Sequence, residues 1–395
     1  MYSPLYFLAA LGAGGLAVSF FLMLMFWIPH PGQQIPVFED WVGAFQTGDL
    51  STQTIVVIGL SGVLFFTYHH VRLLLLNFRL MAGFRKSPDY AQFVKSPSQS
   101  QSLALPLTSA MTINVGFIVG ALFVPKLWSV VENLFPLAML GFLGIGIWAL
   151  TLYARVFQGA SSGTFDLAGT ASFAQVLPAF SLAMVSVGLA APASMSHTPW
   201  IVGVSLTLST FFAMTALILA VFKTAMGLSA MLSKGVESAG LSTLWIWVPL
   251  LTVLAITFMR QDHGVTHTLG LGQKTVWLGP LLMVVSAQLL VLLLGAVAMR
   301  SSGYLGQVWR DEISGAAVFA LICPGVALSV SLHFLINKGF VASGLLEFGS
   351  VGYVLSNSLP VAVTVLTLVA FFRLLRGFSV ARAQWESGRS LSAHS

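Results

Sequence analysis

Residues 316–337 read AAVFALICPGVALSVSLHFLIN, and this apolar stretch decides the fold class. It is long enough to cross a bilayer as a helix, which takes about 20 residues. Pro324 and Gly325 lie near its middle. A proline inside a helix removes one N–H and frees a carbonyl, and in lipid such a break persists only where protein or water satisfies that carbonyl. The stretch therefore predicts a broken membrane-spanning helix, and Cys323 directly precedes the break.

Two interpretations of Cys323, the only cysteine of the chain, stay open. Its thiol is either a functional group beside exposed backbone at membrane depth, or an inert group in a kinked packing helix. Thiolate reactivity requires a lowered pKa and access, and the stretch contains no lysine or arginine. His333, ten residues further on, lies too far along a helix to pair with the thiol. A partner would have to come from another helix.

The composition places the whole chain in the membrane class. Of its 395 residues, 57% are hydrophobic and 8% are charged, whereas soluble domains average about 25% charged residues. The first apolar run lacks the basic start of a cleavable signal peptide, so we expect it to remain as a helix. One cysteine excludes an internal disulfide and a cysteine-rich metal site. Topology explains the net charge of +6, and we expect no nucleic-acid partner.

Ten apolar segments, joined by short polar connections, are long enough to span a bilayer. They predict an all-α integral membrane protein of ten transmembrane helices, arranged as five antiparallel hairpins. Residues 1–376 form the transmembrane domain, and 377–395 form a polar cytoplasmic tail. The segments are 4–28, 53–78, 104–125, 134–156, 173–193, 200–222, 242–259, 276–299, 315–337 and 350–375.

Basic residues predict the orientation, because they concentrate on the cytoplasmic side of membrane proteins. With both termini in the cytoplasm, 14 of the 18 lysines and arginines lie on the inner side. The outer side then holds Lys126, Arg260, Lys274 and Lys338. We expect a multi-pass protein of a bacterial inner membrane with this orientation.

The odd-numbered segments share a pattern that the even-numbered ones lack. Each carries a proline in its cytoplasmic half or near its middle, and most carry small or hydroxylated residues after it. Such residues allow close helix approach and satisfy freed backbone groups. We therefore predict five inner helices around a central pore, although ordinary small-residue packing without a pore is the alternative. The prolines are Pro4, Pro106, Pro178, Pro249 and Pro324. The predicted pore-lining residues are Ser109, Asn114, Ser181, Ser186, Thr252 and Thr257.

With these features, the chain resembles the tellurite-resistance/dicarboxylate transporter family, which includes TehA-like bacterial proteins and plant slow anion channels. The resemblance covers residues 4–376. It is carried by the ten spans, the proline-bearing odd helices and the phrases LALPLTSAMTINVG, QVLPAFSLAM and CPGVALSV. It implies a homotrimer in which each protomer has its own anion pathway, and a gate on the ninth helix.

In that family a phenylalanine of the ninth helix closes the pore. Here Cys323, Pro324 and Gly325 stand at the gate position, so the resemblance implies a thiol at the constriction. Phe334 is a candidate for a displaced constriction. The resemblance also extends to a TsoY-type branch with selenocysteine, in which Cys323 would be the exchanged position. That branch implies selenium, tellurium or sulfur oxyanions as solutes.

Histidines supply the remaining candidate sites. His69 and His70 point about 100° apart on a helix, so at most one of them faces the axis. Haem ligation would need a matching histidine at similar depth, and His333 should lie toward the opposite face. His263 and His267 have metal-compatible spacing, but their flanking glycines favour an outer loop. We expect no metal, no cofactor and no catalytic residue.

The sequence favours a membrane channel or transporter for small inorganic or organic anions, with Cys323 at the central constriction. Hydroxyl groups and backbone dipoles would select the anion, and weak binding would suit throughput. One alternative is a membrane redox protein that uses Cys323 or a haem. Another is a proton-coupled carrier of small acids, which the lack of a mid-membrane carboxylate disfavours.

Overall fold

The structure is a computed structural model, and it describes residues 2–164, 172–236, 238–273, 275–313 and 315–392. Lys274 and residues 393–395 of the predicted tail lie outside these ranges. Every regular element in the described ranges is a helix. The long ones are α1 (Phe7–Trp27), α3 (Leu50–Phe84), α5 (Ala104–Phe123), α6 (Val131–Ser161), α7 (Leu177–Leu189), α9 (Pro199–Lys234), α11 (Trp247–His263), α12 (Leu278–Ser301), α14 (Ile322–Phe334) and α15 (Val351–Ser392).

Shorter helices connect or extend these. They are α2 (Phe38–Thr47), α4 (Pro88–Phe93), α8 (Ala191–Met195), α10 (Ser238–Leu241) and α13 (Tyr304–Trp309). The 3₁₀ helices are η1 (Pro4–Tyr6), η2 (Pro97–Leu103), η3 (Leu127–Val130), η4 (Phe173–Val176) and η6 (Ala316–Leu321), and the π-helices are η5 (Gly264–Thr268) and η7 (Leu335–Val341).

Nine helical stretches of the described residues are long and apolar enough to cross a membrane. The protein is therefore an all-α, multi-helix membrane protein, as the sequence predicts. Each of the ten expected segments contains one of the long helices. The helix of the seventh segment, α11, is 17 residues long and is not among the nine stretches that are long and apolar enough to cross a membrane. Four of the even-numbered segments run further than expected, in α3, α6, α9 and α15, and the 42 residues of α15 make most of the polar tail helical.

The nine stretches fall into two groups by burial. In the stretches that contain α1, α5, α7 and α14, between 56% and 94% of the most apolar window is buried within the protein. In those that contain α3, α6, α9, α12 and α15, the share is between 22% and 33%. Exposed leucine, valine and phenylalanine cover the second group. Large exposed apolar surface on a multi-helix protein is typical of contact with lipid.

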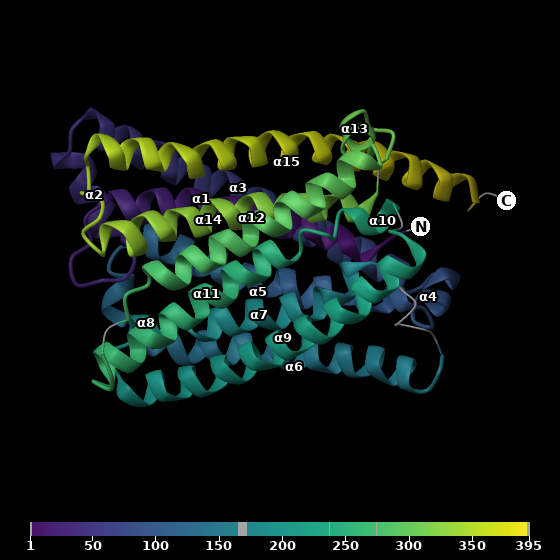
Figure 1. Cartoon of the computed structure of the whole chain (residues 1–395), viewed down its shortest axis with the longest axis horizontal. Helices are drawn as coiled ribbons and strands as arrows, with labels where there is room; N and C mark the ends of the chain where they lie inside the picture. The colour runs from purple at the N-terminus through teal and green to yellow at the C-terminus, as the bar shows by residue number, and fades with distance from the viewer. Residues whose placement is uncertain (1, 165–171, 237, 274, 314, 393–395) are drawn as a thin grey trace.

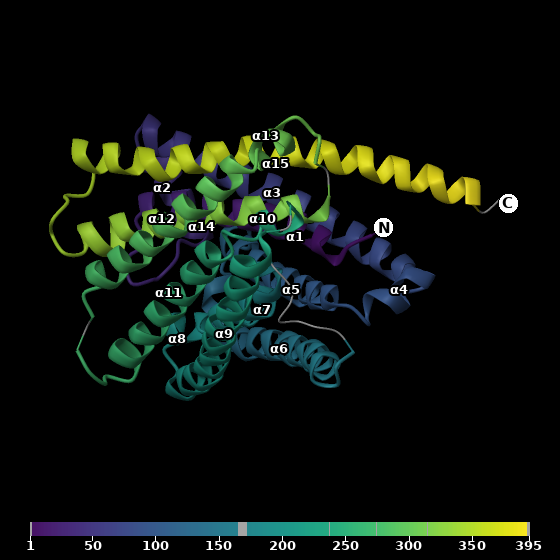
Figure 2. The same ribbon diagram turned by 45° about the vertical axis from the view of Figure 1, so that its right-hand side comes forward.

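The buried helices contact one another in a closed ring. α1 packs against α5, α5 against α7, α7 against α11, α11 against α14, and α14 against α1. Each ring helix also packs against the next long helix in the chain: α1 against α3, α5 against α6, α7 against α9, α11 against α12, and α14 against α15. α2 and α8 lie at one end of this bundle, whereas α4, α13, the start of α1 and the end of α15 lie at the other (Figures 1 and 2).

All five ring prolines lie at helix starts, which corrects the expectation of a break near mid-helix at Pro324. Pro4 opens η1, and the other four stand within the first three residues of α5, α7, α11 and α14. A proline in the first turn loses an N–H that would be unpaired anyway. Pro324 lies just after the 3₁₀ helix η6, so the backbone changes from a 3₁₀ to an α pattern there without an interior break.

Small residues bring the ring helices into close contact. A Cβ atom at Gly12 of α1 would lie 2.8 Å from Ile322 Cγ2, and one at Gly15 would lie 2.9 Å from Val326 Cγ1. A side chain at either position would therefore have to displace Ile322 or Val326 where α1 packs against α14. Gly325 faces outward, because a Cβ there would overlap the hydroxyl oxygen of Thr367 on α15.

The Gly325–Thr367 contact predicts a rescue between two variants. Gly325→Ala should lower the free energy of unfolding by about 2 kcal/mol, because overpacking a filled core strains it. Adding Thr367→Ala removes the overlapping hydroxyl and should restore most of the loss. Thermal unfolding in detergent measures both, with Gly144→Ala as control, since no atom lies within 4 Å of a Cβ there. Equal midpoints for Gly325→Ala and Gly144→Ala would contradict the packing argument.

Candidate functional site

A cavity of ≈ 590 Å³ lies inside the five-helix ring. Its lining positions run from Leu11 to Met25 on α1, from Pro249 to His263 on α11, and from Cys323 to Phe334 on α14, with further walls from α5, α6, α7 and α8. The cavity has its mouth where lining residues are exposed or half-buried, at Gln34 ahead of α2, His267 and Lys338. The cavity therefore follows the ring axis for much of its length.

The opposite end of the ring is filled by side chains. Phe7 and Phe319 are buried, and the rings of Tyr6 and Phe319 lie 6.2 Å apart. None of these residues borders the cavity, whose first lining positions on α1 and α14 are Leu11 and Cys323. The cavity thus ends near Cys323, against a packed layer on the side of the termini.

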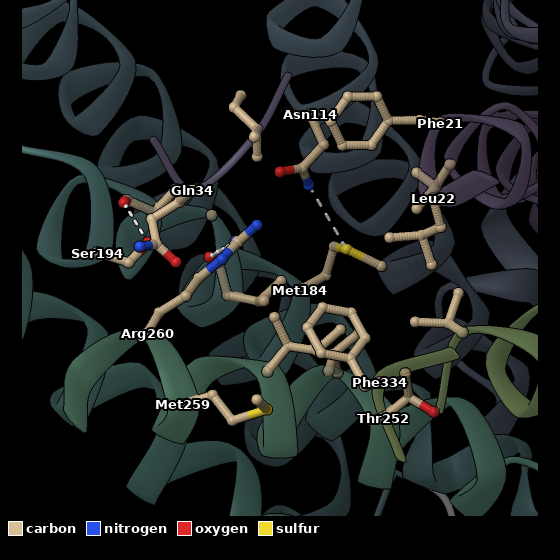
Figure 3. A pocket seen from close by; sticks show the side chains of 18 of the residues that line it. Phe21, Leu22, Gln34, Asn114, Met184, Ser194, Thr252, Met259, Arg260 and Phe334 are labelled. Atoms are coloured by element: carbon tan, nitrogen blue, oxygen red, sulfur yellow. Dashed lines mark hydrogen bonds between the residues drawn. The ribbon is translucent and has the colours of Figure 1, made fainter. Parts of the chain in front are cut away.

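Arg260 lies inside the cavity, although the distribution of basic residues places it only on the outer side of the membrane. Its guanidinium group points into the cavity (Figure 3) and donates a hydrogen bond of 2.7 Å from Nη1 to the carbonyl oxygen of Val187. That carbonyl lies near the end of α7, where helical carbonyls lose their usual donors. Arginine has five N–H donors, so four donors of Arg260 have no hydrogen-bond partner among the described residues.

In the part of the chain that the structure describes, no carboxylate forms an ion pair with this guanidinium group. The ion pairs among the described residues join Arg310 to Glu312 and Arg373 to Asp311, and neither involves Arg260. A cation without a counter-ion in a low-dielectric cavity attracts anions strongly. The sequence contains a signal for this placement. No proline or glycine lies between Pro249 and Gly264, so α11 continues past residue 259, where the predicted span ends.

Asn114 also points into the cavity (Figure 3). Its Nδ2 donates to the carbonyl of Ala110 at 3.2 Å and approaches the sulfur of Met184 at 3.8 Å. A thioether is a weak acceptor. One amide N–H of Asn114 is therefore available to a polar group in the cavity.

Thr252 is the hydroxyl residue that the structure brings to the cavity wall, but its oxygen is already engaged. Thr252 Oγ1 lies 2.9 Å from Ser331 Oγ and 3.1 Å from the carbonyl of Ala327, and it accepts from Gln288 Nε2 at 2.7 Å. Gln288 is completely buried, and the cluster joins α11, α12 and α14. This hydroxyl group stabilises the wall from behind.

The other predicted hydroxyl residues do not border the cavity. Ser109 donates to the carbonyl of Leu105, Thr257 to that of Val253, and Ser186 to that of Ser209 on α9. Ser181 is buried, and its oxygen has no partner among the described residues. These small residues serve helix packing in this structure, and a direct role in conduction remains a prediction.

The predicted gate residues separate into two pairs. Cys323 and Phe334 line the cavity, at its inner end and nearer its mouth respectively. Cys323 is 9% exposed, and the ring of Phe334 packs edge-on against Phe26 at 5.4 Å. Pro324 and Gly325 do not border the cavity. Their place is structural, at the start of α14 and against α15.

The adjacent histidines of α3 differ in environment, as their angular separation implies. His69 is half-buried, whereas His70 is buried, with Nδ1 2.8 Å from the carbonyl of Ala10 and Nε2 2.9 Å from Thr112 Oγ1. Both ring nitrogens of His70 thus cross-link α3 to α1 and α5 and offer nothing to a haem iron. His333 is buried elsewhere, on α14, where its ring stacks on Phe26.

His263 and His267 lie in helical structure at the cavity mouth, which corrects the expected outer loop. His263 ends α11 and His267 belongs to the π-helix η5. Their rings stack at 3.9 Å, and Gln34 Nε2 lies 3.3 Å from His263 Nε2. Asp262 accepts hydrogen bonds from Thr275 and Trp277. In the part of the chain that the structure describes, no three histidine, cysteine or acidic residues are grouped for a metal ion.

The ring, its exposed outer helices and the enclosed cavity define an all-helical, multi-pass membrane protein with a solute-sized internal cavity. No family model matches the chain, and a search of curated proteins gives no match. Its function is therefore argued below from the cavity and the sequence.

Proposed function

We propose that the protein passes small anions across a membrane along the axis of the five-helix ring. The observation that carries this proposal is Arg260, a cation without a carboxylate partner that points into the cavity enclosed by the ring. A preorganised positive group at membrane depth lowers the cost of desolvating an anion. Asn114 adds an amide donor in the same cavity.

The proposal includes ten membrane spans arranged as five hairpins, with α11 and the π-helix η5 together forming the seventh span. Residues 247–268 are long enough for this task. The termini lie in the cytoplasm of a bacterial cell, since the basic residues around α4 and α13 gather at the end where α1 starts and α15 ends. The cavity mouth then faces the outside.

The resemblance to the tellurite-resistance/dicarboxylate transporter family supports the same function. In that family five proline-bearing helices surround the pathway. Here the five helices that carry a proline near their start contact one another in a closed ring. We propose a homotrimer on this basis, with a separate pathway in each protomer. Cys323 is the constriction of that pathway, because the cavity ends there against the packed aromatic layer.

Flux through reconstituted vesicles tests the proposal. Vesicles that carry the protein should take up chloride or acetate faster than protein-free vesicles when valinomycin and potassium balance the charge. Single-channel currents would identify a channel, whereas saturable uptake driven by a proton gradient would identify a carrier. Uptake equal to that of empty vesicles for every anion tested, including selenate and tellurite, would refute the function.

Cys323 should be reached by small thiol reagents from the mouth side of the cavity. We expect a membrane-impermeant methanethiosulfonate to modify most of the protein in vesicles that expose the mouth, and to slow anion flux at least threefold. The Cys323→Ala variant is the control, since it should conduct without responding to the reagent. Mass spectrometry measures the modification. Unmodified wild-type protein in vesicles of both orientations would argue against a route from water to this thiol.

A further inference from the structure

The walls of the cavity are mostly apolar. Phe21, Leu22, Met184, Met259 and Phe334 surround the space into which Arg260 points (Figure 3). The volume of ≈ 590 Å³ lies within the range of cavities that enclose small organic ligands, about 300–1,000 Å³. An inorganic anion on the guanidinium group would leave most of this apolar surface without a partner.

From this arrangement we propose that the cavity binds an amphiphilic monocarboxylate. Its carboxylate lies on Arg260, and its hydrocarbon part lies against the phenylalanine and methionine walls. This inference rests on the proposed function and names its substrate class. Guanidinium groups pair with carboxylates through two parallel N–H···O bonds, and the bond to Val187 occupies only one nitrogen of Arg260.

The charge of the site limits the charge of its ligand. Arg260 and Lys338 are the lysine and arginine residues among the cavity's lining positions. Lys338 belongs to the π-helix η7 at the mouth and has interactions of its own. Asp262 also lines the cavity, but its carboxylate accepts hydrogen bonds from Thr275 and Trp277. The guanidinium group of Arg260 is therefore the cation that faces the ligand inside the cavity. The cost of desolvating an ion rises with the square of its charge, so selenate, sulfate and dicarboxylates should bind less tightly than a monocarboxylate.

The apolar walls should make affinity depend on chain length. Transfer of one methylene group from water to an apolar site favours binding about fourfold. Affinity should rise by this factor for each carbon from acetate to pentanoate, provided that each added methylene reaches the walls. An uncharged analogue of the same shape fills the same space but loses the guanidinium contact.

Calorimetric titration of the wild-type protein in lipid nanodiscs tests the inference, with empty nanodiscs subtracted to correct for partition of the acids into lipid. We expect Kd to fall about fourfold per carbon from acetate to pentanoate. Butanamide and sulfate should each bind at least tenfold more weakly than butanoate. Arg260→Gln should weaken butanoate binding at least tenfold, and Arg300→Gln, at the exposed end of α12, should not change it.

A Kd that is independent of chain length, or equal for butanoate and butanamide, would overturn the inference. Binding of sulfate as tight as that of butanoate would do the same. These comparisons use the wild-type protein, so they decide the question even if Arg260→Gln fails to fold. Chain-length-dependent binding without vesicle flux would refute transport alone, whereas flux with flat binding would refute the substrate class alone.

Discussion

Vesicles that carry Arg260→Glu should take up chloride at least a hundredfold more slowly than wild-type vesicles. At about 5 Å and an effective dielectric constant of about 20, a unit charge contributes about 3 kcal/mol to the energy of an anion. Reversal of the charge removes this attraction and adds a repulsion of similar size. Because no carboxylate pairs with Arg260, its replacement leaves no acidic partner stranded in the cavity.

The same variant should also change which ions pass. A carboxylate that points into the cavity favours cations, so the potassium-to-chloride permeability ratio should rise, as measured from the reversal potential across a salt gradient. Arg260→Lys should retain part of the flux, because it keeps the charge but loses the planar donors. Arg300→Glu is the matched control for a change of net charge. Wild-type chloride flux in folded Arg260→Glu protein would exclude this cavity as the anion route.

The all-α membrane class could be predicted because it depends on hydrophobic length, whereas nine stretches of the described residues, not ten, are long and apolar enough to cross a membrane. Each predicted segment has its helix, and the error lies in the ends: α3 and α9 extend well beyond 53–78 and 200–222. Polar residues without a proline continue a helix past the apolar stretch, and hydropathy does not register that continuation. For the same reason the predicted span ends at residue 259 and leaves out Arg260, which lies four residues before Gly264 and is still helical.

The site could be predicted only in part, because spacing along one helix does not fix what that helix packs against. Asn114, Thr252, Cys323 and Phe334 border the cavity, whereas Gly325 meets Thr367 on a neighbouring helix. Thr252 shows a further limit. Its hydroxyl group lies at the wall, yet Gln288 from α12 and Ser331 from α14 occupy it. Such contacts depend on three helices that are far apart in sequence.

Cys323→Phe should reduce chloride flux at least tenfold while the protein remains folded. Cys323 is the first lining position of the cavity on α14, and the packed layer that includes Phe319 fills the ring beyond it. A phenyl ring would fill that end of the cavity. It would thereby restore the aromatic group that the resemblance places at this position.

The matched variant Cys323→Ala removes the thiol without filling the cavity and should conduct at least as fast as the wild type. Cys323→Phe could lose flux because the phenyl ring blocks the cavity or because it clashes with the cavity wall. Thermal unfolding separates these causes: a blocked cavity leaves the unfolding midpoint near that of the wild type, whereas a clash lowers it. If folded Cys323→Phe conducts as fast as Cys323→Ala, anions do not pass this thiol. The route would then have to leave the cavity between Arg260 and Cys323, through a wall of the ring rather than along its axis.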